Sequence, residues 1–326
     1  MLWLAFLCLA RGTVIGTPYR VRSLLAQQIE AVQSNCQLQN TPHMMPGYGL
    51  GSDLHTWGQV LCQSIERGHR LQVHGPWLWT DKRNCPNTNA NVLACYFPLE
   101  EALCTENSTG IGRLDKLGDC PSFWTDVVNK TLYRTAATEY LFSRGLRHFV
   151  RDEIASQLRD VFKADRVPSK MITVHMRWGD KAGEMTLVAA QEYVDAVQTL
   201  VTTKRQPNTP VHVYVSTEDP KAYAAFLDAA PPQWHIYADA MLTRMQSYRP
   251  NSGNHAKISA IQSNGEAGTV ALASLAIAME ATDYVLTTGS NWSRLMDELR
   301  RGVLDPRCKK CTTMVDLRPL SPDSKF

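Results

Sequence analysis

The stretch "HMRWGDKAGEM", which begins at His175, follows a short apolar run and places four charged side chains within eight positions. Within it, Arg177 offers a planar guanidinium that can bind two phosphate oxygens at once, which a lysine cannot reproduce. Lys181 and Glu184 are the side-chain types of an acid–base pair that acts on a hydroxyl group. Together with Asp180, these residues predict an anion-binding site with a proton-transferring group beside it.

The same four charges also have a structural interpretation. Arg177 and Asp180 are close enough in sequence to form an ion pair, and Lys181 and Glu184 have the i,i+3 spacing of a surface pair. The whole stretch would then be a solvated turn after a strand. The elements around it are needed to decide between a site and a turn.

The second half of the chain alternates between short apolar runs and amphipathic segments. The strands predicted from these runs cover residues 171–178, 211–217, 235–237 and 284–288. The helices predicted between and after them cover residues 188–202, 219–230, 266–281 and 292–301. This alternation predicts a parallel, doubly wound sheet, in which ligands bind beyond the carboxyl ends of the strands.

Three of the predicted strands end in polar residues. The charged stretch follows the first, Glu218 and Asp219 follow the second, and "TTGSNWS", with Ser290 and Asn291, follows the last before a helix begins. Because the carboxyl ends of parallel strands share one edge of the sheet, these residues are predicted to converge on one site. For Glu218 and Asp219 the alternative is to cap the helix that starts at Pro220.

The first half begins with a short helix predicted at residues 24–32. A glycine-rich turn with Gly49 and Gly51 then leads into an amphipathic helix, and residues 71–73 follow as a strand. A glycine-rich turn before a helix lets backbone N–H groups approach a phosphate, although a tight turn alone has the same composition.

Residues 74–125 predict loops, and a long helical region at 125–161 follows. The polar segment "KADRVPSK" then predicts a boundary between a domain at 21–165 and a second at 166–326. Residues 1–20 contain an apolar run of only nine residues, which is too short to span a bilayer. This run predicts the remnant of a signal or of a membrane anchor.

Composition and charge limit the classes of function. The chain has 326 residues, of which 44% are hydrophobic and 20% charged, as is ordinary for a globular protein. A formal net charge of +3, without a run of lysines or arginines, argues against a nucleic-acid partner. The sequence has no D-x-D pair placed to hold a metal ion. An anionic ligand must therefore be bound by a local group of residues.

Nine cysteines indicate an oxidising compartment. Cys8 lies in the apolar N-terminus, and the remaining eight are Cys36, Cys62, Cys85, Cys95, Cys104, Cys120, Cys308 and Cys311. An even number, half of it in one loop-rich stretch, predicts disulfides and the lumen of the secretory pathway. For Cys308 and Cys311, zinc binding would need a second pair of ligands nearby, so the motif predicts a disulfide.

The charged stretch that begins at His175 resembles a motif of the alpha-1,6-fucosyltransferases that act on N-glycan cores. These enzymes form glycosyltransferase family 23. The family's strongest motif runs H-V-R-R-T-D-K-x-G-T-E, with a tyrosine nine positions after the glutamate, as here. The matching residues are His175, Arg177, Asp180, Lys181, Gly183, Glu184 and Tyr193. One residue fewer separates the lysine from the glutamate in this chain, and Trp178-Gly179 replaces the family's Arg-Thr.

The family's other motifs are matched more loosely. "VYVSTEDP" resembles V-Y-L-A-T-D-D-P and places Glu218 and Asp219 in its acidic positions. "TTGSNWS" stands in place of T-F-S-S, with Asn291 near the final serine, and "GLGSDLH" resembles the early loop G-Y-G-x-Q-L-H. The aspartate expected on the helix before the third strand is missing, with Ser274 nearby. The resemblance covers residues 36–303.

The resemblance implies a GT-B-like α/β enzyme with an acceptor-side first domain and a Rossmann-like second domain that binds the nucleotide sugar. It implies inverting transfer of fucose from GDP-fucose to a hydroxyl of an N-glycan or another glycan, without a metal or a cofactor. The implied catalytic residues are Arg177, Lys181 and Glu184. The implied donor-binding residues are Gly49, Gly51, His175, Asp180, Tyr193, Glu218, Asp219, Ser290 and Asn291.

Other functions fit the same residues. The same scaffold serves protein O-fucosyltransferases and transferases of other nucleotide sugars, and a lectin-like secreted protein would keep the fold and the disulfides without catalysis. Tyr193 is equally expected to pack on its own sheet. The expected partners are a nucleotide-sugar donor and a glycan or glycoprotein acceptor in the Golgi lumen, with membrane contact only through an N-terminal anchor.

Overall fold

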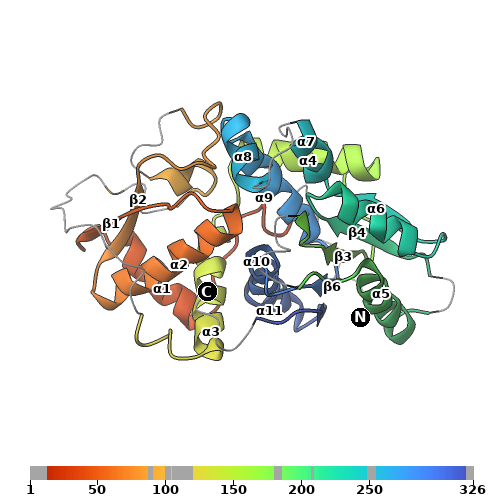
Figure 1. Ribbon diagram of the computed structural model, residues 1–326. Helices are drawn as coiled ribbons and strands as arrows, with labels where there is room; N and C mark the ends of the chain where they lie inside the picture. Colours follow the sequence, from red (N-terminus) through yellow and green to blue (C-terminus); the bar gives the residue numbers. More distant parts are fainter. Residues whose placement is uncertain are drawn as a thin grey trace, which may run out of the picture.

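The second half of the chain is built around five strands, which are β3 (Ile172–His175), β4 (His212–Ser216), β5 (His235–Ala238), β6 (Asp283–Leu286) and β7 (Thr313–Asp316). They form one parallel sheet in the order β5-β4-β3-β6-β7 (Figure 1). Counted along the chain from β3, this order is 3-2-1-4-5, so the direction in which strands are added reverses between β3 and β6. This is the strand order of a Rossmann-like doubly wound sheet.

The structure is a computed structural model that describes residues 13–86, 91–99, 104, 120–179, 186–206, 209–247 and 255–320. Helix α4 (His148–Phe162) precedes the second half. The helices of the second half are α5 (Ala190–Lys204), α6 (Pro220–Ala229), α7 (Ala240–Ser247), α8 (His255–Gln262), α9 (Glu266–Ala278), α10 (Asn291–Leu299), the π-helical turn η4 (Arg300–Leu304) and α11 (Asp305–Cys308).

Alternate residues of β3 face two different layers of helices. Ile172 and Val174 belong to the apolar cluster that contains residues of α5 and α6. The intervening Thr173 faces the other layer, where its hydroxyl donates to the carbonyl of Ala278 in α9 at 2.8 Å. Because helices cover both faces, every residue of β3 is buried, as is typical of a central parallel strand.

The first half contains a small sheet and three helices, which are α1 (Leu24–Ser34), β1 (Asn40–Met44), α2 (Leu50–Glu66), β2 (Arg70–His74), the 3-10 turn η1 (Val92–Cys95) and α3 (Val127–Phe142). β1 and β2 pair in parallel. The buried Gln33 of α1 is joined to β2, since its amide accepts from the N–H of Leu71 at 2.8 Å and donates to the carbonyl of Leu71 at 3.1 Å.

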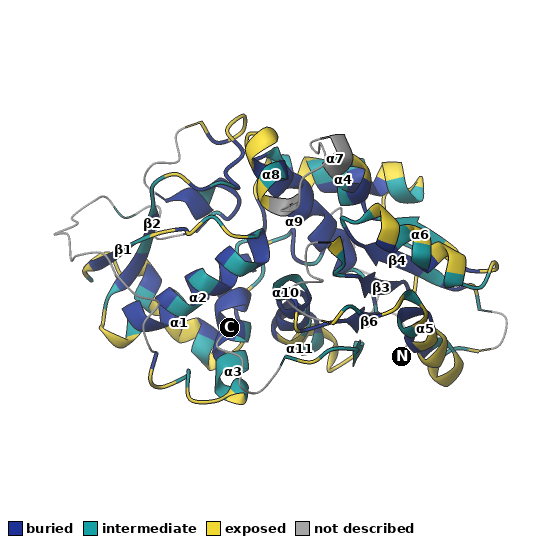
Figure 2. Cartoon of the chain, in the orientation of Figure 1, coloured by how far each residue is buried: buried dark blue, intermediate teal, exposed yellow. Residues whose placement is uncertain are grey.

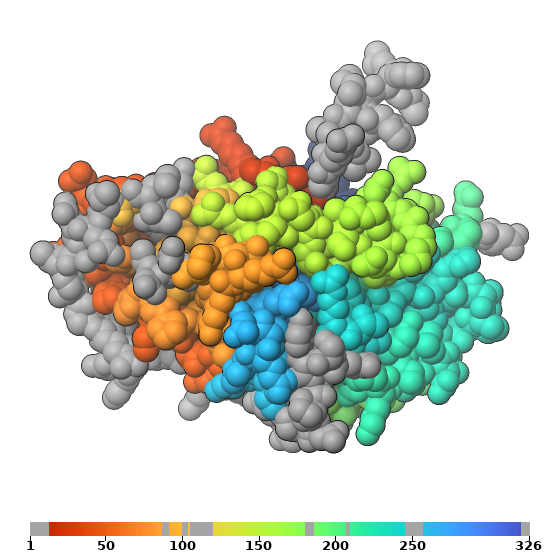
Figure 3. Space-filling view, turned by 90° about the horizontal axis from the view of Figure 1, so that it is seen from above, coloured from red at the N-terminus to blue at the C-terminus, as the bar shows by residue number. Residues whose placement is uncertain are grey.

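One apolar core joins the two halves. Residues Ala267 to Ala278 of α9 are all buried and α9 packs on α4, while α10 packs on α2 and α3 (Figure 2). The same core extends from Ile15 to Leu304. In Figure 3 the yellow-green segment that includes α4 lies between the orange first half and the teal second half. The division of the chain at residue 165 therefore remains a prediction, because the core is continuous across it.

The predicted α/β class and the parallel Rossmann-like sheet are confirmed, whereas the two-domain GT-B arrangement stays a prediction. The helix predicted at 125–161 is two helices, α3 and α4, because the chain turns at Gly145 with a φ of +71°. A Cβ on Gly145 would lie 2.8 Å from the carbonyl oxygen of Gly16, so only glycine fits this close approach. Six of the described elements have no counterpart among the predicted ones, namely β1, η1, α7, α8, α11 and β7.

The eight cysteines that follow the N-terminal segment form four disulfides, which are Cys36–Cys104, Cys62–Cys120, Cys85–Cys95 and Cys308–Cys311. The predicted disulfides are confirmed, and they indicate an oxidising compartment. The motif at Cys308 and Cys311 is a local disulfide, so neither sulfur is a free thiolate ligand. Among the described residues, no helix combines the length and the apolar character needed to cross a membrane.

Candidate functional site

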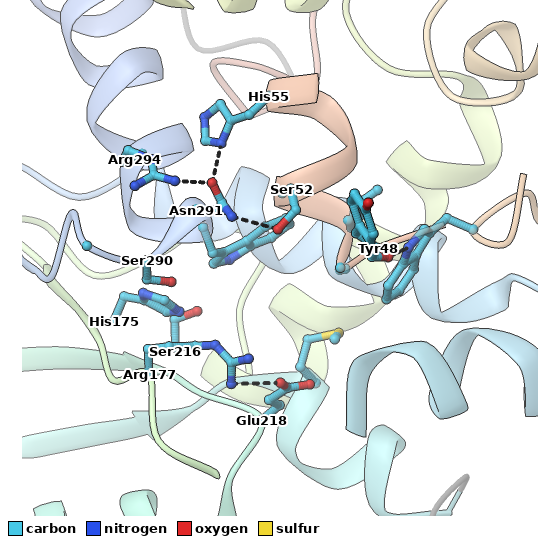
Figure 4. A pocket seen from close by; sticks show the side chains of 18 of the residues that line it. Tyr48, Ser52, His55, His175, Arg177, Ser216, Glu218, Ser290, Asn291 and Arg294 are labelled. Carbon is cyan, nitrogen blue, oxygen red and sulfur yellow. Dashed lines mark hydrogen bonds and ion pairs between the residues drawn. The ribbon is translucent and has the colours of Figure 1, made fainter. Parts of the chain in front are cut away.

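A cavity of about 930 Å³ lies at the carboxyl ends of β3, β4 and β6, where the strand order reverses. Parallel α/β sheets bind ligands at such a point, because neighbouring connections leave the sheet in opposite directions and open a crevice. The start of α2 closes the cavity from the first half of the chain. Figure 4 shows the resulting wall, in which Ser52 and His55 of α2 lie beside the start of α10, above the strand-end residues.

His175, the last residue of β3, is buried in the cavity wall. Its Nδ1 lies 2.6 Å from the hydroxyl of Ser293, which also accepts from the backbone N–H of Thr287 at 3.1 Å. Burial, and to a smaller degree the charge of Arg177, lowers the pKa of His175 to about 3, so the ring is neutral at physiological pH. When Ser293 donates to Nδ1, the ring carries its proton on Nε2 and is an uncharged donor there.

Arg177 reaches from the end of β3 toward the end of β4. Its Nη1 lies 3.3 Å from Oε1 of Glu218 and donates to the carbonyl of Trp178 at 2.9 Å (Figure 4). The two side chains are 15% and 21% exposed and both line the cavity. An arginine held in this way is oriented before a ligand arrives and can still direct donors at an anion. The alternative pair with Asp180 falls outside the described residues.

The N-terminus of α10 points at the same space. Ser290 is its N-cap, and the side chain of Ser290 makes no capping hydrogen bond to the first turn. The N–H groups of a first turn carry partial positive charge and bind anions at helix starts. Gly51 lies against this turn, because a Cβ there would lie 3.2–3.3 Å from atoms of Asn291 and Trp292. Gly51 thus lets α2 approach α10, while Gly49 is the N-cap of α2.

A buried carboxylate holds the glycine-rich turn in place. Asp53 accepts from the backbone N–H of Tyr48 and from the indole N–H of Trp77, both at 2.8 Å. Burial raises the pKa of Asp53 to about 6, although these hydrogen bonds oppose the rise. Gly47, with a φ of +74°, makes the turn that brings Tyr48 to the cavity edge.

A fourth strand end, that of β5, contributes an acid that the sequence patterns do not single out. Asp239 follows β5, and its carboxylate accepts from the hydroxyl of Ser216 at 2.9 Å and from the backbone N–H of Met241 at 2.8 Å. It lines the cavity together with Ser274, and burial raises the pKa of its carboxyl. A sequence pattern could have identified Asp239, because this acid follows β5 just as Glu218 follows β4.

A hydrogen-bond network that is also missing from the sequence analysis joins α2 to α10. Asn291 donates to the hydroxyl of Ser52 at 2.6 Å, and its side-chain oxygen contacts both Nδ1 of His55, at 2.9 Å, and Arg294 (Figure 4). Nε2 of His55 lies 3.1 Å from the carboxylate of Glu298. Asn291 therefore lies in the cavity wall, and its side-chain amide is already engaged.

The predicted site residues divide into three groups. Those brought together at the cavity are Gly49, Gly51, His175, Arg177, Glu218, Ser290 and Asn291. Two others have structural roles. Asp219 caps α6 by accepting from the N–H of Lys221 at 2.8 Å, and Tyr193 is buried in the apolar cluster that contains Val174. The rest, Asp180, Lys181 and Glu184, lie outside the described residues. Whether Asp219 and Tyr193 contact a donor stays a prediction.

No protein-family model matches this chain, and no curated protein does. The functional assignment therefore depends on the geometry of the cavity and on the residues of the charged stretch.

Proposed function

We propose that this chain is an inverting glycosyltransferase that transfers fucose from GDP-fucose to a hydroxyl group of a glycan. The observation that carries the proposal is the cavity at the strand-order reversal, where Arg177, the start of α10 and the glycine-rich start of α2 surround one space. Guanidinium groups and helix N–H groups are the donors that proteins use for diphosphates. The motif resemblance narrows the ligand to a GDP-sugar and the fold to a GT-B-like pair of domains.

In this proposal the departing GDP is stabilised by fixed donors. Arg177 directs its guanidinium at the phosphate oxygens, the first turn of α10 adds backbone N–H groups, and His175 donates without adding a charge. Donors that are already oriented stabilise charge as it develops, because they need not reorganise during the reaction. Activity is therefore expected to survive EDTA. Complete loss on chelation, restored by Mn²⁺, would contradict this mechanism.

The nucleoside part of the donor needs acceptors as well as donors. Glu218 and Asp239 both present carboxylates at the cavity wall, and carboxylates accept from the N–H groups of a base and the hydroxyls of a ribose. Asp239 is the acid that joins Glu218 at this edge, since Asp219 is occupied as a helix cap. We assign the guanine and ribose contacts to these two residues.

The acceptor hydroxyl must lose a proton as it attacks. We assign this step to Glu184, with Lys181 beside it to offset the negative charge of the donor. The acceptor oxygen bonds to the anomeric carbon of fucose while the bond from that carbon to the phosphate oxygen breaks. The proton passes to Glu184 and the electron pair leaves with GDP. The first half of the chain then holds the glycan, and the disulfides suit an enzyme of the secretory pathway, in the Golgi lumen.

Calorimetric titration of GDP, GDP-fucose and UDP tests the proposal. The protein should bind GDP and GDP-fucose, and Arg177→Lys should weaken GDP binding roughly 10- to 150-fold, as expected for one lost charge-assisted hydrogen bond. Arg166→Lys is the matched control, because Arg166 is exposed in the turn that precedes β3, at the opposite edge of the sheet. A protein that binds neither GDP nor GDP-fucose would be lectin-like or unrelated, and the proposal would fail.

A further inference from the structure

Arg134 is a buried cation with no hydrogen-bond acceptor in the part of the chain that the structure describes. It lies on α3, is 4% exposed and lines the cavity. A guanidinium has five N–H donors, yet within the described residues none of those of Arg134 has an acceptor, and its Nε is fully enclosed. Its guanidinium carbon lies 5.6 Å from the ring centre of Trp124. Since buried polar groups almost always have partners, this arginine indicates a ligand that completes it.

A second guanidinium lies close to the first. Arg294 of α10 is 7% exposed, donates from Nη1 to the carbonyl of Thr288 at 3.1 Å and contacts Asn291 through Nη2. Its Nε has no acceptor among the described residues. Burial, followed by the charge of Arg134, lowers the pKa of Arg294 to about 10, which still leaves it protonated at neutral pH. The guanidinium groups of Arg134 and Arg294 are therefore both buried and repel each other.

One described carboxylate, that of Glu298, partly offsets these two charges. Glu298 attracts both arginines, but its oxygens are engaged by the hydroxyl of Thr138 at 2.9 Å and by Nε2 of His55 at 3.1 Å. Among the described residues, two guanidinium groups and one carboxylate leave a surplus positive charge here even when His55 is neutral. A buried charge without compensation is unfavourable, and an anionic ligand would remove the imbalance.

This group lies away from the ends of β3 and β4, where Arg177 and Glu218 are. Ser52, His55 and Gln59 line the cavity along one face of α2, each about one helical turn from the last, and Arg134 borders a small adjoining cavity with His55. In Figure 4, Arg294 and His55 lie on one side of Asn291, whereas Arg177 and Glu218 lie on the other. The two arginine groups thus occupy different ends of the cavity, and Arg134 occupies the end built by helices of the first half.

We propose that Arg134 and Arg294 form a second anion site, which binds an oxyanion of the acceptor, the carboxylate of a uronic acid or a sulfate ester. The inference rests on the proposed function in one respect, that the first half of the chain holds a glycan. A planar guanidinium binds two oxygens of a carboxylate or a sulfate at once. The acceptor is then an acidic glycan, because a neutral one could accept hydrogen bonds from Arg134 but would leave the surplus positive charge uncompensated.

Binding titrations on the protein saturated with GDP test this site without depending on catalysis. The probes are glucuronate, glucose 6-sulfate, inorganic sulfate and, as the neutral match, glucose. The first two should bind and glucose should not. Arg134→Met should weaken their binding roughly 10- to 100-fold, as for a lost charge-assisted contact, and Arg134→Lys should lose part of it. GDP affinity should be unchanged in both variants.

Each contrary result has a definite meaning. If Arg134→Met lowers GDP affinity, the guanidinium serves the donor phosphates and the acceptor site is wrong. If inorganic sulfate binds as tightly as glucose 6-sulfate, the site holds a free ion and not an acceptor group. If neither acidic sugar binds better than glucose, or if Arg134→Met does not fold, the arginine is structural and the proposal fails. A wild-type protein that binds no GDP would refute the proposed function, whereas the anion site would still be judged by its own titration.

Discussion

The two ends of the cavity hold their arginines in opposite ways. At the strand ends, Arg177 faces Glu218 at 3.3 Å and is 15% exposed. At the helix end, Arg134 is 4% exposed and none of its N–H groups has an acceptor within the described residues. The first arginine faces a carboxylate of its own before a ligand arrives, whereas the second shares the attraction of Glu298 with Arg294.

An anion that binds at Arg177 and one that binds at Arg134 therefore meet different energetic costs. An anion at Arg177 must compete with Glu218, so part of the attraction is offset by the pair that it disturbs. An anion at Arg134 displaces no described carboxylate and supplies acceptors that are otherwise missing. The strand end is therefore suited to a group that must leave again, such as a product diphosphate, and the helix end to a group that selects which acceptor enters.

The largest expected effect concerns the proton acceptor of the charged stretch. Glu184→Gln keeps the size and most hydrogen bonds of the side chain but cannot take a proton. It should lower kcat by roughly 10²–10⁴ and leave GDP affinity nearly intact. Rapid-quench or steady-state transfer assays, together with GDP titration, measure both quantities.

The control for this prediction is Asp228→Asn, which removes an exposed carboxylate from α6. One residue fewer separates Lys181 from Glu184 than in the family motif, so the prediction for Glu184 depends on an inexact match. Turnover at the parent rate in Glu184→Gln, with Arg177→Lys inactive, would keep the anion site and move the base to another residue.

The next effect concerns Asp53, which holds the glycine-rich turn before α2. The pKa of Asp53 is raised from 3.8 to about 6, so the folded protein binds a proton there more tightly than the unfolded chain. Asp53 therefore favours folding most at low pH, and this contribution is lost as the pH rises from about 4 to 6, by about 3 kcal/mol in total. Asp53→Asn cannot titrate, so its free energy of unfolding should fall less over that interval.

Urea unfolding of both proteins at several pH values between 4 and 7 measures the difference. Asp53→Asn should also be less stable at each pH, because its amide cannot accept from both Tyr48 and Trp77. Parallel stability curves for the two proteins would show that Asp53 ionises normally and that the turn is held by other contacts.

How much of the site the sequence predicts depends on how its residues are spaced. Arg177, Glu218 and Ser290 each follow an apolar strand directly, so a local pattern identifies them and the parallel sheet brings them together. Arg134 is in the middle of a helix, among residues that share no local motif. Its burial follows only from the packing of α3 on α2 and α10, which no short stretch encodes.

The same reasoning explains the elements that differ. β1 contains Pro42 and lies in a two-stranded sheet at the molecule's edge, so it lacks the apolar run of a central strand. β7 is an edge strand whose residues are all only partly buried. Conversely, β3, which helices cover on both faces, is apolar enough to be predicted from its sequence alone.

The smallest expected effect compares the two arginines directly through stability. Arg177→Met removes the cation that faces the partly buried Glu218, and it should lower the free energy of unfolding by about 1–2 kcal/mol. Arg134→Met removes a buried cation without an acceptor and replaces it with an apolar side chain of similar length. Its stability should be unchanged or higher by up to about 2 kcal/mol, because the surplus positive charge disappears. Urea unfolding at pH 7 without ligands measures both, and equal losses in the two variants would mean that Arg134 is as firmly compensated as Arg177.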